Sequence, residues 1–88
     1  MASRSVKLGS KVGLHARPAA MFTKAAAAAG IAVTISKEGG KAVNAASILS
    51  VLTLNAGFGD EVTISAEGEN ADQVIADLAA MLERDLDA

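Results

Sequence analysis

Alternation of apolar and polar side chains in two segments is the feature that most limits how this chain can fold. Ile31–Lys37 and Glu61–Glu67 both alternate with a period of two, which predicts strands with one buried and one solvated face. The expected solvated face carries Thr34, Ser36, Thr63 and Ser65. Because the apolar face of such a sheet has to be buried, we expect an antiparallel sheet covered by helices on one face and open on the other.

Further strands and helices are predicted around these two segments. The additional strands are Ser5–Gly9 and Lys41–Asn44, and a tight glycine-containing turn precedes the second of them. The alanine-rich run Ala19–Ala29 favours a helix, with Pro18 in its first turn and Gly30 at its end.

A last helix is expected near the end of the chain. Asn70 would cap it, with Gln73 as the reciprocal partner three positions later. Its predicted buried stripe consists of Ile75, Leu78, Ala79 and Leu82.

The segment Ser47–Leu54 supports two interpretations. Ile48, Val51 and Leu52 are spaced for one face of a helix that Ser47 would cap, but the β-branched residues also favour a strand. With the helix, the elements predict an α+β fold in which a four-stranded antiparallel sheet carries three helices on one face. We expect a single domain over residues 1–88.

The composition excludes several kinds of site. The chain has no cysteine, which removes disulfides, thiolate metal ligands and cysteine nucleophiles, and we expect no metal or cofactor. A net charge of −2 and an aromatic content of 2% argue against a nucleic-acid-binding domain. No apolar run approaches the ~20 residues of a membrane span, and the N-terminal residues do not look like a signal peptide. We therefore expect a cytoplasmic protein that does not insert into membranes.

His15 is the only histidine and the candidate reactive residue. It follows Gly13 and precedes the predicted helix, whose first-turn N–H groups and dipole favour an anion. Arg17 adds a positive charge and a planar set of donors two residues away. Because a neutral imidazole is a competent nucleophile, these residues predict reversible phosphoryl transfer through His15. The alternative is that His15 is an ordinary exposed residue beside a helix start.

Three segments carry a wider similarity. Gly13–Ala19, Lys41–Leu49 and Asp60–Gly68 together resemble the HPr family, the histidine phosphocarriers of the bacterial sugar phosphotransferase system. The first is similar to the active-site signature of that family, the second to the signature around its regulatory serine, and the third to its last strand and following turn. The resemblance covers nearly the whole chain in the same order.

The resemblance implies a carrier rather than an enzyme, with the open-faced β-sandwich of that family. His15 would accept a phosphoryl group from phospho-enzyme I, which phosphoenolpyruvate charges, and would pass it to the IIA domains of sugar permeases. Arg17 would stabilise the group during both transfers. We expect the protein to be a monomer.

Ser47 matches the serine that an HPr kinase/phosphorylase modifies in some relatives. A phosphate there would lie at a helix start, which makes the modification physically reasonable. The alternative is that Ser47 serves only as an N-cap. Ala46 stands where many regulated relatives carry lysine, which argues against recognition by that kinase.

Ile48, Leu49 and Leu52 cannot all face the core from one short helix. In the HPr family, apolar residues of this helix form a docking surface beside the histidine, so we predict that Leu49 and Leu52 are partly exposed. We assign them to partner binding together with Ile48 and with Lys24, which would extend the positive rim begun by Arg17. The alternatives are that the three apolar residues belong to the core and that Lys24 is merely solvated.

Two other functions are compatible with the sequence. A paralogue in a regulatory or nitrogen-linked phosphorelay would keep His15 but dock different partners. A purely regulatory binding protein would act through Ser47, although such relatives typically lose the histidine.

Overall fold

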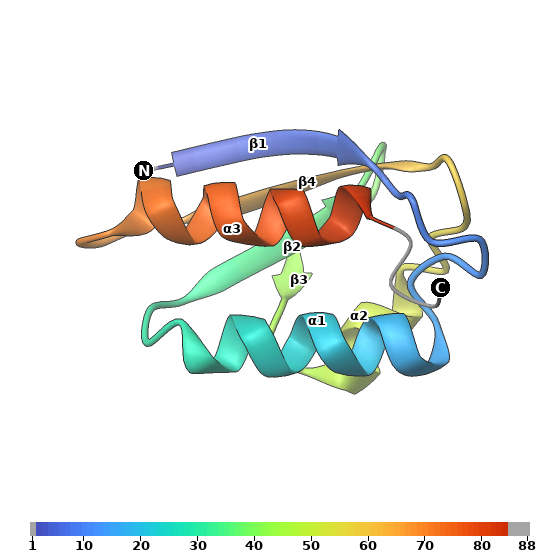
Figure 1. The fold of residues 1–88 in the computed structure, drawn as a ribbon, viewed down its shortest axis with the longest axis horizontal. Coiled ribbons are helices and arrows are strands. Elements are labelled where there is room, and N and C mark those ends of the chain that lie inside the picture. Colours follow the sequence, from blue (N-terminus) through green and yellow to red (C-terminus); the bar gives the residue numbers. More distant parts are fainter. Residues whose placement is uncertain (1, 85–88) are drawn as a thin grey trace.

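The alternating segments form the strands of one antiparallel sheet, and helices cover one of its faces. The computed structural model describes residues 2–84. Figure 1 shows the elements in chain order, which are β1 (Ala2–Lys7), α1 (Ala16–Ala28), β2 (Val33–Lys37), β3 (Val43–Asn44), α2 (Ile48–Thr53), β4 (Glu61–Ala66) and α3 (Ala71–Glu83). This order and the α+β fold agree with the prediction.

The four strands lie in the order β1-β4-β2-β3, and every neighbouring pair is antiparallel. The long strand β4 is central, so that Ile64 is paired with Arg4 on one side and with Ile35 on the other. On the open face, the hydroxyl groups of Ser5 and Thr63 are 2.7 Å apart, and the Ser65 hydroxyl donates to that of Ser3 at 3.1 Å. The expectation of one polar, uncovered face is therefore confirmed.

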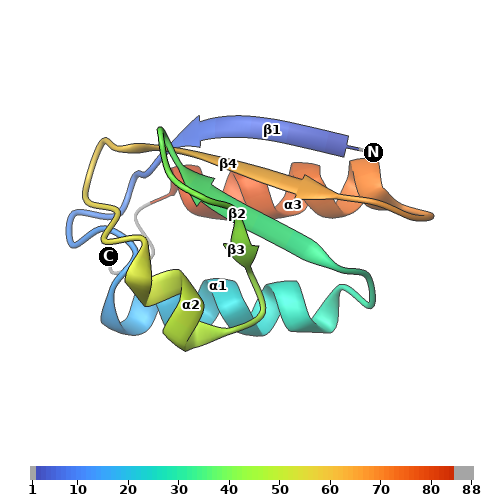
Figure 2. The same cartoon turned by 180° about the vertical axis from the view of Figure 1, so that it is seen from behind.

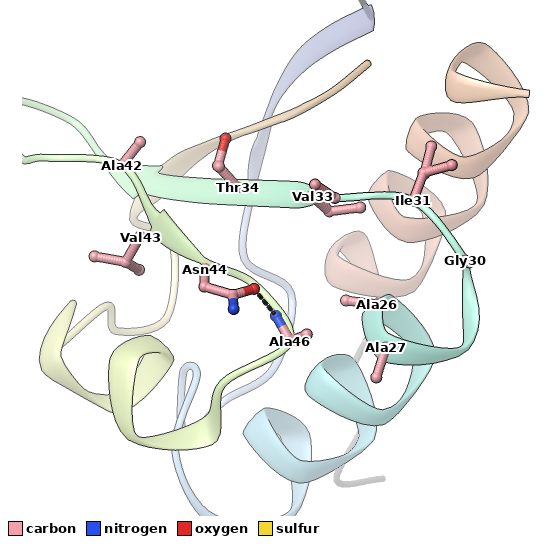
Figure 3. Close-up of a pocket in the computed structure, with 11 residues that line it drawn as sticks. Ala26, Ala27, Gly30, Ile31, Val33, Thr34, Ala42, Val43, Asn44 and Ala46 are labelled. Carbon is pink, nitrogen blue, oxygen red and sulfur yellow. Dashed lines mark hydrogen bonds between the residues drawn. The ribbon is translucent and has the colours of Figure 1, made fainter. Parts of the chain in front are cut away.

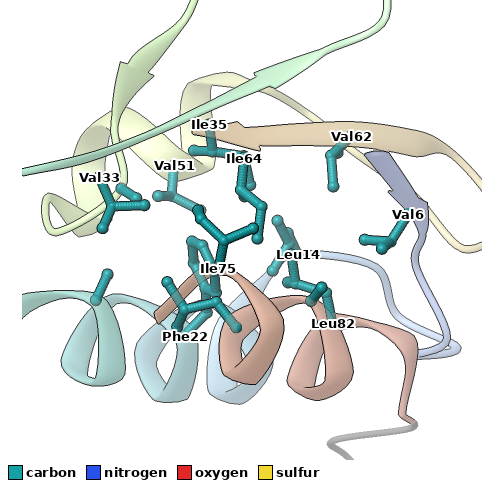
Figure 4. Packing of buried hydrophobic residues seen from close by; sticks show 14 of the residues in the cluster. Val6, Leu14, Phe22, Val33, Ile35, Val51, Val62, Ile64, Ile75 and Leu82 are labelled. Carbon is teal, nitrogen blue, oxygen red and sulfur yellow. The ribbon is translucent and has the colours of Figure 1, made fainter. Parts of the chain in front are cut away.

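The opposite face of the sheet is covered by the helices. In Figures 1 and 2, α1 and α3 lie next to each other, and α2 lies beside α1 near the short strand β3. The core between sheet and helices is built from aliphatic residues around Phe22 (Figure 4). The predicted stripe of α3 is buried, as expected for Ile75, Leu78, Ala79 and Leu82.

Several predicted boundaries were wrong by a few residues. The first strand occupies Ala2–Lys7 rather than Ser5–Gly9, because it pairs along its whole length with β4. α1 ends at Ala28 rather than Ala29, whereas its start at Ala16 agrees with the placement of His15 before the helix and Pro18 in its first turn. The predicted strand Lys41–Asn44 shrinks to Val43–Asn44, because only these two residues pair with β2.

The segment Ser47–Leu54 forms a helix, as one of its two interpretations predicted. Ser47 is the N-cap of α2, and its hydroxyl accepts the Ser50 N–H at 3.3 Å. Of the three residues spaced for one face of this helix, only Val51 is buried in the core, and Ile48 and Leu52 lie at the exposed edges of that face.

The predicted capping box of the last helix was also wrong. Asn70 does occupy the N-cap position of α3, but its backbone is left-handed (φ 65°) and its side chain makes no capping bond. Gln73 instead donates its side-chain N–H to the Asp77 carboxylate at 2.9 Å, one turn further along the helix. A capping box requires an extended N-cap backbone, which Asn70 does not have.

Candidate functional site

His15 is the N-cap residue of α1, so it is the last residue of the β1–α1 loop and directly precedes the first helical residue. Its backbone is extended (φ −131°, ψ 162°) and its imidazole, which is partly exposed, makes no capping hydrogen bond. The first-turn N–H groups of a helix lack intrahelical partners, and the helix dipole adds partial positive charge there. α1 has no acidic residue in its first turn that would offset this charge. The site therefore presents a partly accessible imidazole beside a positive helix end.

Leu14 anchors the chain directly before His15. Its side chain is 2% exposed and points into the core between the helices and the sheet (Figure 4). Its N–H donates to the carbonyl oxygen of Ala56 at 2.9 Å. A buried side chain and a backbone hydrogen bond thus hold the residue next to the imidazole on two sides.

Gly13 allows this close approach between two loops. It has a positive φ of 73°, and a Cβ atom on it would collide with the Ala56 carbonyl oxygen and lie 2.7 Å from the Gly57 Cα. A residue with a side chain would therefore be strained by both its backbone conformation and its neighbours. The role of Gly13 in the predicted site is to let the backbone of the histidine loop touch that of the α2–β4 loop.

Asp60 organises the α2–β4 loop from within. Its carboxylate accepts the Gly57 N–H at 2.8 Å and lies 3.4 Å from the Lys37 ammonium, which also donates to the Asn55 carbonyl oxygen at 3.3 Å. The bond from Gly57 is the main reason why the pKa of Asp60 lies below its ordinary value; partial loss of solvent opposes this shift, and Lys37 reinforces it. No role was predicted from the sequence for Lys37, Gly57 or Asp60. An aspartate at the end of a glycine-rich turn was the available signal, because such side chains commonly accept turn N–H groups.

The two loops are joined at a second point close to the sheet. The Leu8 N–H donates to the Asp60 carbonyl oxygen and the Gly59 N–H donates to the Leu8 carbonyl oxygen, both at 3.0 Å. Figures 1 and 2 both show the β1–α1 and α2–β4 loops side by side at the end of α1 that begins with His15. His15 is therefore held by a segment that is more than 40 residues away in the sequence but adjacent in space.

The predicted basic residues lie on α1. Arg17 is in the first turn, two residues after His15, and its side chain is exposed. Lys24 lies further along the same helix and is also exposed. Both side chains are therefore accessible to a bound anion or to an acidic partner surface.

The apolar residues assigned to docking are exposed on α2. Leu49 has 76% of its surface exposed, Ile48 40% and Leu52 37%, which confirms that Leu49 and Leu52 lie outside the core. Figures 1 and 2 place α2 beside the part of α1 that follows His15. Three exposed apolar residues on one short helix are unusual for a surface that has no binding role.

The same end of the molecule carries exposed apolar residues that the sequence analysis did not assign to docking. Val12, in the histidine loop, and Met21, on α1, are exposed. Phe58 lies between two glycines in the α2–β4 loop, with 64% of its surface exposed.

A pocket at the opposite end of α1 has no comparable chemistry. It encloses about 550 Å³ between the last turn of α1, the start of β2 and strand β3 (Figure 3). Its lining has no charged residue, and the side-chain oxygen of Asn44 is already occupied by the Ala46 N–H at 2.9 Å. At a rise of ~1.5 Å per residue, the helix separates this pocket from His15 by roughly 16 Å.

Two structural features are absent from residues 2–84. No three His, Cys, Asp or Glu side chains in this range are grouped so as to hold a metal ion. No helix in the same part of the chain has the length and apolar character needed to span a membrane.

The match to a protein family covers almost the whole chain. The family model described as "PTS HPr component phosphorylation site" matches residues 2–84. The phosphocarrier protein HPr of Streptomyces coelicolor is 45% identical over 87 residues, which cover 99% of this chain and 94% of that protein.

Solved structures agree with the fold. The phosphocarrier protein HPr from Bacillus anthracis superimposes with a TM-score of 0.87 at 38% identity, and the match covers 92% of this chain and 95% of that one. Crh of Bacillus subtilis, reported as a domain-swapped intertwined dimer, gives a TM-score of 0.73 at 38% identity, with 94% of each chain covered. Because a relative forms such a dimer, the expected monomeric state stays a prediction. The family match, the relatives and the shared fold together show that this chain belongs to the HPr family of the phosphotransferase system.

Proposed function

We propose that His15 accepts a phosphoryl group from phospho-enzyme I and passes it to the IIA domains of sugar permeases. The observation that carries this proposal is the position of His15 at the N-cap of a helix of 13 residues, with its imidazole partly exposed and free of any capping bond. A capping histidine that bonded its own helix would have its donor or acceptor occupied. This one is available to a group that arrives from solvent.

The helix start favours the phosphorylated state. A phosphoryl group on the imidazole is doubly negative near neutral pH, and the first-turn N–H groups, the dipole and the exposed Arg17 all offer positive charge to it. We propose that Arg17 stabilises the phosphoryl group during both transfers, because its guanidinium can donate hydrogen bonds to two phosphoryl oxygens at once.

The transfer itself requires little from the protein. A neutral imidazole nitrogen of His15, by family resemblance Nδ1, attacks the phosphorus, and the bond between the phosphorus and the donor atom of phospho-enzyme I breaks as the new bond forms. In the second transfer, the nitrogen–phosphorus bond on His15 breaks as the IIA domain forms its own bond to the phosphorus. Positioning and charge stabilisation are then the tasks of the carrier.

We propose that Ile48, Leu49 and Leu52 form the docking surface for both partners, with Lys24 on its basic side. The exposure of these apolar side chains supports this assignment, and so does the packing of α2 against α1. Because both partners would use the same surface, they could not bind at the same time, and the carrier would have to leave enzyme I before it binds a IIA domain.

The test is a labelling experiment with phosphoenolpyruvate, enzyme I and this protein. We expect one phosphate per chain that is labile in acid and stable in base, as a phosphohistidine is, and its loss on addition of a sugar-permease IIA domain. His15→Ala must abolish the label, and Arg4→Ala, which removes a basic side chain from β1, must leave it unchanged. Failure of the wild-type protein to be labelled would overturn the carrier function. Label that only a nitrogen-linked IIA homologue can discharge would instead identify the paralogous relay.

We also propose Ser47 as a second, regulatory phosphorylation site. Its place at the N-cap of α2 supports this, because the helix start would stabilise an added phosphate. The hydroxyl currently caps the helix by accepting the Ser50 N–H, so a kinase would have to displace a weak bond of 3.3 Å. The test uses ATP and an HPr kinase/phosphorylase, with Ser47→Ala as control. Absence of acid-stable phosphate, under conditions that label a relative, would remove this site.

A further inference from the structure

We infer that Asp60 is a positioning residue for phosphoryl transfer at His15, acting through the peptide group between Ala56 and Gly57. This inference rests on the proposed function of His15. The carbonyl oxygen of that peptide group accepts the Leu14 N–H at 2.9 Å, and its N–H donates to the Asp60 carboxylate at 2.8 Å. One rigid, planar unit therefore links the Asp60 side chain to the residue that precedes His15.

The hydrogen bond from Gly57 to Asp60 fixes the orientation of the Ala56–Gly57 peptide plane. The Ala56–Gly57 peptide belongs to the glycine-containing α2–β4 loop, and rotation of its plane would turn the carbonyl oxygen away from Leu14. The bond to the carboxylate opposes that rotation. A charged acceptor on the N–H also polarises the amide, which strengthens its carbonyl oxygen as an acceptor.

Lys37 secures the arrangement from the sheet. Its ammonium lies 3.4 Å from the Asp60 carboxylate and donates to the Asn55 carbonyl oxygen at 3.3 Å, so one side chain from β2 holds both ends of the loop. Both members of this pair are partly exposed, with 37% and 41% of their side-chain surface accessible. Such pairs are weak, so Lys37 supports the position of Asp60 while the bond to Gly57 performs the coupling.

The consequence for transfer follows from the connection between Leu14 and the helix start. Leu14 is fixed by its buried side chain and by the bond to Ala56, and His15 comes next with its extended N-cap backbone. When the second restraint is lost, the imidazole samples more orientations relative to the first-turn N–H groups. A smaller fraction of collisions with a phosphorylated donor is then productive.

The experiment compares Asp60→Ala with Asp60→Asn, since only asparagine retains an oxygen that can accept the Gly57 N–H. We expect Asp60→Ala to lower kcat for phosphorylation by enzyme I about fivefold, well short of the ~10²-fold that a 1 Å misplacement can cost, and to leave KM nearly unchanged. Asp60→Asn should restore most of the rate, and Lys37→Met should change it less than twofold. Amide hydrogen exchange should be faster at Leu14 in Asp60→Ala but not in Asp60→Asn.

A matched control separates positioning from a general loss of stability. Ile75→Val removes one methyl group from the middle of α3, about two turns before Leu82, where that helix contacts the β1–α1 loop, and should destabilise the fold without slowing transfer. Wild-type rates in Asp60→Ala, an Asp60→Asn variant as slow as Asp60→Ala, or equal slowing by Ile75→Val would each overturn the inference. Wild-type protein that enzyme I cannot label would instead overturn the proposed function, so the two failures are distinguishable.

Discussion

Gly13 and Gly57 lie backbone against backbone, so that a Cβ atom on Gly13 would come within 2.7 Å of the Gly57 Cα. This contact joins the loop that carries His15 to the loop that Asp60 organises. It allows the Leu14 N–H to reach the Ala56 carbonyl oxygen. The histidine is therefore held by two loops, although it belongs to only one of them.

The first prediction concerns this contact. Gly13→Ala places a side chain at φ 73° and against the second loop, so we expect a loss of about 3 kcal/mol in the free energy of unfolding. Gly39→Ala is the matched control, because Gly39 has φ 80° but no atom within 4 Å of its Cβ position, and it should lose only about 1 kcal/mol. Urea denaturation of the three proteins measures the difference. Equal losses of unfolding free energy in the two variants would mean that the contact between the two loops does not contribute to stability.

Arg17→Ala should slow transfer without unfolding the protein. Because its side chain is exposed, we expect the free energy of unfolding to change by less than about 0.5 kcal/mol. The rate of phosphorylation by enzyme I should fall at least about tenfold, since one charged donor to the phosphoryl group is lost. Arg17→Lys should give an intermediate rate, because it keeps the charge but not the planar pair of donors. Rapid-quench kinetics would measure these rates, and a wild-type rate in Arg17→Ala would contradict the proposed role.

Leu49 and Val51 should respond in opposite ways to truncation, although both lie on α2. Leu49 has 76% of its surface exposed and Val51 has none. Leu49→Ala should leave stability within about 0.5 kcal/mol and raise KM for enzyme I or for a IIA domain. Val51→Ala should cost about 2 kcal/mol of stability and leave KM unchanged at a temperature where it is folded. An unchanged KM in Leu49→Ala would remove this residue from the docking surface.

The capping role of Ser47 can be measured apart from any modification. Ser47→Ala removes the acceptor for the Ser50 N–H, and we expect a loss of about 0.5–1 kcal/mol in the free energy of unfolding. Ser47→Asp keeps an acceptor and adds a negative charge at the helix start, so it should be at least as stable as the wild type. Thermal or urea unfolding distinguishes these outcomes. A destabilised Ser47→Asp variant would show that α2 gains nothing from an anion at this position.

The last prediction is a pH dependence that comes from Asp60. Its pKa lies below the ordinary value of 3.8 because the ionised carboxylate accepts the Gly57 N–H, so folding favours the ionised form. The stabilisation is therefore fully present above pH 3.8 and is lost as the pH falls through the lower pKa of the folded state. The difference in unfolding free energy between wild type and Asp60→Asn should be constant at neutral pH and should shrink in acid. The Gly57 amide proton shift reports the same titration, and a midpoint above 3.8 would contradict the assigned bond.

The strand and helix segments show where local reasoning succeeded. Period-two alternation identified β2 and β4, and alanine content identified most of α1, because both signals act over neighbouring residues. The ends of β1 were missed, since they depend on pairing with β4 across the sheet. The capping box at Asn70 failed for a related reason: sequence pattern carries no information on whether the backbone before a helix is extended or left-handed.

The sequence by itself determined the family of this protein. A lone histidine before a helix start, an arginine two residues later and two further matching segments were sufficient to predict the family, because these features lie within short stretches of chain. Only the tertiary structure decided how the histidine is held and what surrounds it. The bonds from Leu14 to Ala56 and from Gly57 to Asp60, and the exposure of Leu49 beside a buried Val51, depend on the approach of distant segments. Such an approach is set by the packing of the whole core, which no local pattern contains.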